Sequence, residues 1–176
     1  MSAQEDANSL HSFTQAFKGL GLGIVLAYLA LVSFDFGRVH ISFMFLPLAA
    51  VFLWPRNAST AWSLVFVFIL GVFFDVITSG PLGVWGLSYL LIFILFDGGV
   101  GQSMKGTLAF AGFAFALFLV YCLSLIFGRL AMGHWPDGLS LAVNAAASLA
   151  VFPICYGVFA LASGSLKQPS HTRVVR

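Results

Sequence analysis

The stretch AWSLVFVFILGVFFDVITSGPLG, residues 61–83, carries one carboxylate, Asp75, at the end of an apolar run and follows it with a glycine-proline turn. A run this long and this apolar is typical of a segment surrounded by hydrocarbon. The whole chain has the same character, because 60% of its 176 residues are hydrophobic and only 8% are charged. An average soluble domain has about 25% charged residues. The composition therefore indicates an integral membrane protein.

Segments without any ionised residue recur along the chain. They cover 19–34, 39–55, 57–74, 76–96, 106–128 and 138–166. About 20 apolar residues cross a hydrocarbon core, and snorkelling or aromatic residues extend shorter segments. We therefore predict an all-α integral membrane protein, a compact bundle of six transmembrane helices within residues 18–163. The approximate spans are 19–36, 39–55, 60–78, 83–97, 107–128 and 139–162, with tails at 1–17 and 164–176.

The positions of the basic residues predict the orientation. With six spans both termini lie on one side, and the loops and tails of that side hold six of the eight lysines and arginines, namely Lys18, Arg56, Lys105, Lys167, Arg173 and Arg176. Arg38 and Arg129 fall on the other side. Because loops rich in basic residues stay in the cytoplasm, we expect both termini to be cytoplasmic.

The sequence has no arrangement typical of catalysis or of cofactor or metal binding. DGGVGQS (97–103) lacks the GK[ST] ending of a phosphate-binding loop, and no HExxH motif occurs. None of the four histidines lies in mid-membrane with a partner at helical spacing. No basic cluster is dense enough for nucleic acid. We therefore expect a protein that is not an enzyme and that holds no cofactor.

Asp75 is the main functional candidate, because ionisable residues inside membranes are expensive to bury. A carboxylate near the end of its own helix is also opposed by the helix dipole, so Asp75 needs a partner. The N–H groups around Thr78 to Gly80 could fold back onto it, and Arg38 or Arg129 could pair with it. Two interpretations stay open. Asp75 either staples the turn and does nothing more, or it organises a surface or cavity that another molecule contacts.

The residues around Asp75 favour a tight turn and close helix packing. Pro81 fixes one φ angle, while Gly80 and Gly83 permit sharp backbone turns, and GVWG (83–86) could pack backbone against backbone. Further along, Asn144 lies beside small residues and predicts a helix–helix contact with one interhelical hydrogen bond. Pro153 is expected to kink the last helix.

The segment FILGVFFDVITSGPLGVWGLSYLL (68–91) resembles the signature of the MreD family of bacterial rod shape-determining membrane proteins. The matching positions are Gly71, Asp75, Ser79, Gly80, Pro81, Leu82 and Gly83. The length, the short loops and a last helix with Asn144 and Pro153 fit the family over the whole chain. Many family members have a Pro-Asp pair leading into the second span, where this chain reads RVHIS (38–42).

The resemblance implies a non-enzymatic scaffold in the bacterial inner membrane. It implies partnership with MreC and, indirectly, with MreB, RodA and a class B penicillin-binding transpeptidase in sidewall peptidoglycan synthesis. The implied fold is similar to the six-helix substrate-binding subunits of vitamin transporters. The alternative is therefore a membrane-embedded substrate-binding subunit of a small-molecule transporter, which would need a polar-lined cavity.

Overall fold

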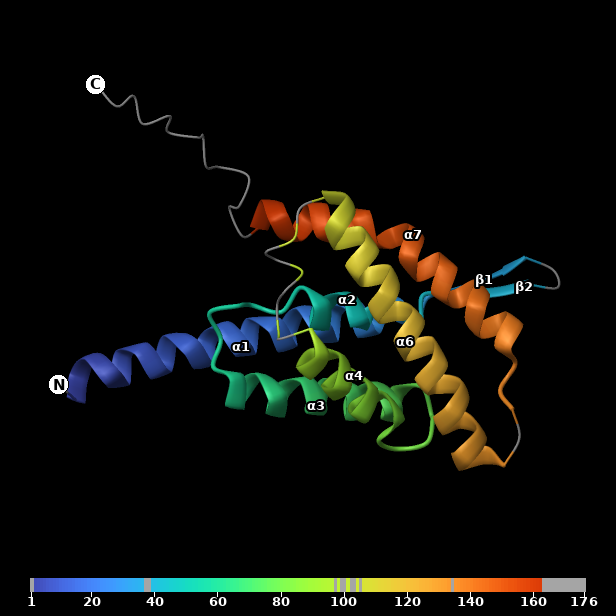
Figure 1. Ribbon diagram of the computed structural model, residues 1–176, viewed down its shortest axis with the longest axis horizontal. Helices are drawn as coiled ribbons and strands as arrows, with labels where there is room; N and C mark the ends of the chain where they lie inside the picture. The colour runs from blue at the N-terminus through green and yellow to red at the C-terminus, as the bar shows by residue number, and fades with distance from the viewer. Residues whose placement is uncertain are drawn as a thin grey trace, which may run out of the picture.

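The computed structural model describes residues 2–36, 39–96, 98, 101, 104, 106–133 and 135–162. Most of these residues are helical, and one short β-hairpin projects from an end of the helical body (Figure 1). The elements are α1 (Ser2–Ala30), β1 (Ser33–Phe36), β2 (Val39–Ser42), α2 (Pro47–Phe52), α3 (Thr60–Ile77), α4 (Val84–Leu95), α6 (Gly106–Met132) and α7 (Gly138–Ala162).

Among the described residues, four helical segments are long and apolar enough to cross a membrane. They are Leu10–Ala30 in α1, Thr60–Ile77 in α3, Gly106–Ala131 in α6 and Gly138–Phe159 in α7. Their outward faces expose large apolar side chains, such as Phe68 on α3, Phe118 on α6 and Ile154 on α7. Contiguous apolar surface of this kind is unfavourable in water and favourable in lipid. The chain is therefore a predominantly helical membrane protein, as its composition predicts.

The segment predicted as the second spanning helix, 39–55, is not a single helix. The predicted first span, 19–36, also ends early, because α1 stops at Ala30 and Ser33–Phe36 form a strand. β1 and β2 pair antiparallel with Phe36 opposite Val39. Two strand-like runs separated by Gly37-Arg38 are a hairpin signal, and β-branched residues favour strands. Pro47 then begins α2, since proline lacks an N–H and suits the first turn of a helix.

The short helix α2 lies inside the protein. All six of its residues are buried, and it contacts α1, α4 and α6. At its end Phe52 contacts Phe96, Phe113 and Phe152 in edge-to-face geometry, with ring centroids 5.6, 5.9 and 6.0 Å away. Phe113 and Phe152 stack on one another at 4.0 Å. These rings join α2, α6 and α7 into one core, because buried aromatic pairs add to the free energy gained from their buried area.

The predicted fourth span, 83–97, appears as α4, a helix of 12 residues. At 1.5 Å per residue it is about 18 Å long, which is short for a hydrocarbon core of roughly 30 Å. It packs along α3 as the second arm of a helical hairpin, visible at the bottom of Figure 1. Six full-length spanning helices are therefore not confirmed.

Candidate functional site

The Asp75 carboxylate lies where α3 meets the beginning of α4, and it is fully buried. Its two oxygens accept three backbone hydrogen bonds. The N–H of Gly83 donates to Oδ2 at 2.8 Å, the N–H of Trp85 donates to Oδ1 at 3.0 Å, and the N–H of Gly86 donates to Oδ2 at 3.4 Å. A side chain at the end of one helix thus binds the first N–H groups of the next helix.

This arrangement makes Asp75 the N-terminal cap of α4. The N-cap residue, Gly83, has φ = 95° and no side chain with which to cap the helix. The N-terminus of α4 has unsatisfied N–H groups and a partial positive charge, and both favour a carboxylate. This gain offsets the unfavourable position of Asp75 at the end of α3. The cap spans eight to eleven residues of sequence instead of the usual two or three.

The N–H groups that donate to the Asp75 carboxylate are not those of Thr78 to Gly80, which the sequence suggested. The N–H groups of Thr78 and Gly80 instead donate to the backbone carbonyls of Phe74 and Asp75, at 3.0 and 3.1 Å, and so end α3. The carboxylate points past this turn to the start of α4. The glycine-proline turn therefore closes the helix hairpin, while the capping N–H groups come from residues beyond it.

Two glycines bring the helices close enough for this contact. A Cβ on Gly71 would lie 2.4 Å from Cα of Gly86 and 2.6 Å from its N, a separation that atoms do not tolerate. Gly71 stands one turn before Asp75, on the same face of α3. The close approach of Gly71 and Gly86 therefore places the Asp75 carboxylate within reach of the N-terminus of α4.

The other motif residues form the turn itself. Ser79 has φ = 53°, a left-handed conformation that is uncommon for a residue other than glycine. Leu82 is 74% exposed. Gly80 and Pro81 line a cavity next to the turn. The structure thus brings all seven motif positions, Gly71, Asp75, Ser79, Gly80, Pro81, Leu82 and Gly83, into one hairpin.

The two arginines suggested as charge partners of Asp75 have different outcomes. Arg38 lies outside the described residues. Arg129 donates to the carbonyl of Gly133, and its guanidinium lies 5.8 Å from the ring centroid of Trp135. Among the described residues, the hydrogen bonds that the Asp75 carboxylate accepts all come from backbone N–H groups.

A cavity of about 460 Å³ adjoins the outer surface of this turn. It lies between the turn, α6 and the start of α7, and its polar lining consists of Thr78, Ser79 and Ser124. The described lining includes no charged side chain; the remainder is glycine, proline and apolar residues, among them Trp85 and Leu141. Asp75 itself is sealed beneath the turn. The cavity suits an apolar occupant better than a charged one.

Asn144 makes a contact of a different kind from the one expected. Its Oδ1 accepts the N–H of Ser42 at 2.9 Å, so α7 holds the edge of the hairpin strand β2 and not another helix. Ser148, one turn on, accepts the N–H of Phe45 at 3.3 Å. Pro153 lies inside α7 with its side chain exposed, and the kink expected there stays a prediction.

No group of three or more metal-ligating side chains occurs among the described residues. Both cysteines are free thiols within α6 and α7. Comparison of the chain with protein-family models, with curated proteins and with solved structures finds no match.

Two site residues were not singled out at the sequence level. Trp85 and Gly86 donate two of the three hydrogen bonds to Asp75. The spacing in GVWG (83–86) was a signal for close packing, since it places two glycines one turn apart. This glycine spacing did not indicate that the backbone N–H groups of α4 donate to the Asp75 carboxylate.

Proposed function

We propose that this chain is a non-enzymatic membrane scaffold of the bacterial cell-elongation complex, as its resemblance to the MreD family implies. The observation that carries the proposal is the state of Asp75. The only carboxylate in the apolar hairpin is buried and accepts three backbone N–H groups. A buried carboxylate that accepts three backbone hydrogen bonds holds the helix hairpin together and is not accessible to a substrate.

The proposed partners follow from the resemblance. An MreC-like membrane protein is the direct partner, and MreB, RodA and a class B penicillin-binding transpeptidase take part indirectly in sidewall peptidoglycan synthesis. The exposed apolar faces of α3, α6 and α7 offer surface for a partner helix as well as for lipid. The proposed location is the bacterial inner membrane.

The proposed topology keeps both termini in the cytoplasm, with six passes of which two use the short helices α2 and α4. It is supported by the return of the chain after α2, because a Cβ on Gly19 in α1 would lie 3.0 Å from the side chains of Trp54 and Pro55. The chain after α2 thus runs back alongside α1 as far as Gly19. The proposal requires a reporter fused to either terminus to be cytoplasmic.

Depletion of the chain in its native cell tests the function. If the chain is a scaffold of elongation, rods should round up, and incorporation of a fluorescent D-amino acid into the sidewall should fall severalfold while septal incorporation continues. Re-expression of the wild-type chain should restore both. Rods of unchanged width and unchanged sidewall labelling after depletion would contradict the proposal.

The second candidate, a substrate-binding subunit of a transporter, draws support from the cavity beside the turn. Its volume of about 460 Å³ lies within the usual range of about 300–1,000 Å³ for ligand sites. The few polar groups in its described lining restrict this candidate to apolar ligands. Growth that depends on an external nutrient, with unchanged cell shape, would favour it.

A further inference from the structure

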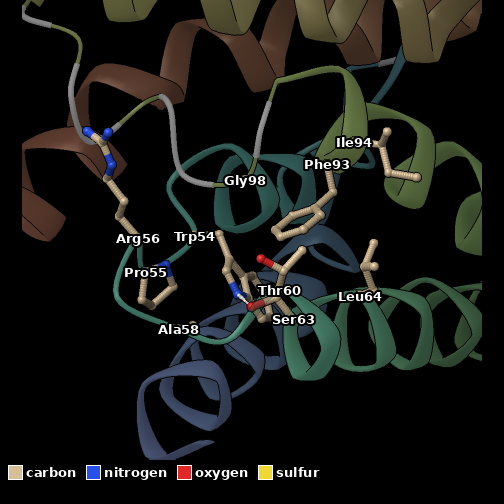
Figure 2. A pocket seen from close by; sticks show the side chains of 10 residues that line it. All are labelled: Trp54, Pro55, Arg56, Ala58, Thr60, Ser63, Leu64, Phe93, Ile94 and Gly98. Atoms are coloured by element: carbon tan, nitrogen blue, oxygen red, sulfur yellow. Dashed lines mark hydrogen bonds between the residues drawn. The ribbon is translucent and has the colours of Figure 1, made fainter. Parts of the chain in front are cut away.

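A second cavity, of about 320 Å³, lies at the opposite end of α3 from Asp75. Figure 2 shows it between the start of α3 and the end of α4, with Thr60 and Ser63 below and Phe93 above. Its lining is divided. Arg56 stands at one side and the apolar side chains of Leu64 and Ile94 at the other (Figure 2).

The polar side of this cavity offers hydrogen-bond donors. Ser63 is 1% exposed, and its Oγ accepts the indole N–H of Trp54 at 2.9 Å. Its own hydroxyl proton has no acceptor among the described residues. Thr60 adds a second hydroxyl, and Arg56 adds a guanidinium. Arg56 is the one charged side chain among the described lining residues.

Backbone N–H groups at the start of α3 also favour an anion in this cavity. α3 begins at Thr60, and its N-cap, Ser59, makes no side-chain capping hydrogen bond. The first N–H groups of a helix favour an anion. α4 ends beside the cavity, and its last carbonyls would repel an anion if they were free. Two of them are occupied, since the N–H of Phe96 donates to Ile92 and the N–H of Gly98 donates to Phe93, both at 3.0 Å.

Aromatic residues of α1 and α3 gather beside this end of α3. Phe13 and Phe17 of α1 contact Phe66 of α3 at ring-centroid distances of 5.6 and 6.3 Å, and Phe13 also contacts Trp62 at 5.1 Å. Trp62 is 47% exposed. Tryptophan is enriched at the boundary between membrane and water. An exposed tryptophan beside the cavity therefore favours a position of the cavity near the phosphate groups of lipids.

We infer that this cavity binds the phosphate group of an anionic phospholipid. The phosphate lies against Thr60, Ser63 and Arg56, and one acyl chain follows the apolar wall of Leu64 and Ile94. Ile94 is 65% exposed on the side of α4. The acyl chain can therefore extend past Ile94 into the membrane. The apolar wall favours a lipid over free phosphate, because free phosphate has no apolar group that could contact this wall. The inference is independent of the proposed scaffold function.

Native mass spectrometry of the full chain in a maltoside detergent tests the site. The titrants are phosphatidylglycerol, phosphatidylcholine and inorganic phosphate. The variants are Arg56→Gln and Thr60→Val, with Lys18→Gln as the matched control, because Lys18 is an exposed cation of α1 that does not line the cavity. Melting temperatures without added lipid report whether each variant is folded.

The wild-type chain should bind one phosphatidylglycerol at least about fivefold more tightly than phosphatidylcholine. Arg56→Gln and Thr60→Val should each weaken this binding by about five- to tenfold, as expected for loss of a bond to a charged group, while Lys18→Gln should change it less than twofold. Equal losses in Arg56→Gln and Lys18→Gln, with binding by Thr60→Val unchanged, would show general charge attraction and overturn the site. Displacement of lipid by millimolar inorganic phosphate would assign the site to a soluble anion and overturn the lipid. If Arg56→Gln does not fold, Thr60→Val decides alone, because Thr60 is an exposed residue in the first turn of α3.

Discussion

At the scale of single residues, Asp75 shows how a carboxylate can be retained in an apolar hairpin. The cost of burying it is met by three backbone N–H groups and by the positive end of α4. The sequence was sufficient to predict that Asp75 needs a partner near the turn. It was not sufficient to identify the donors, because these depend on how far α4 folds back along α3.

Substitution of Asp75 should separate its capping role from its charge. Asp75→Asn keeps one acceptor oxygen but turns an NH₂ group toward a backbone N–H, so it should destabilise the protein by about 1–3 kcal/mol. Asp75→Leu leaves all three donors without an acceptor and should cost more than about 3 kcal/mol. The measurement is the melting temperature in detergent together with the yield of folded protein. Equal losses in the two variants would refute the capping role.

At the scale of elements, the α3–α4 hairpin depends on the contact between Gly71 and Gly86. The spacing of glycines predicted close packing, and that part of the interpretation was correct. The second predicted helix was wrong for a local reason. The prediction rested on the absence of charge over 39–55, but this region holds the strand β2 and the short helix α2, which begins at Pro47. Hydropathy alone does not distinguish a buried short helix from a spanning one.

Gly71→Ala tests the helix contact directly. The added methyl group would meet the backbone of Gly86, which cannot rotate away as a side chain could, and the expected cost is about 2–3 kcal/mol. Gly21→Ala is the matched control, because a Cβ on Gly21 in α1 meets nothing within 4 Å. It should leave stability unchanged or raise it by up to about 1 kcal/mol, because alanine favours a helix interior more than glycine does. Similar melting temperatures for both variants would mean that α3 and α4 do not pack closely.

At the scale of the whole molecule, a buried core surrounds α2 and an apolar surface faces lipid. Phe52, Phe113 and Phe152 join elements that are far apart in the sequence. Such long-range pairs could not be predicted, because phenylalanine occurs in every predicted span and composition does not specify which rings meet. The membrane setting was predictable, since composition alone determines it.

A gentle-detergent pulldown of the tagged wild-type chain from its native membrane, analysed by mass spectrometry, tests the scaffold proposal most directly. An untagged strain defines the background. The proposal predicts enrichment of an MreC-like membrane protein together with cell-wall synthases. Recovery of ATP-binding cassette subunits in their place would contradict it and assign the cavity beside the Asp75 turn to a transported substrate.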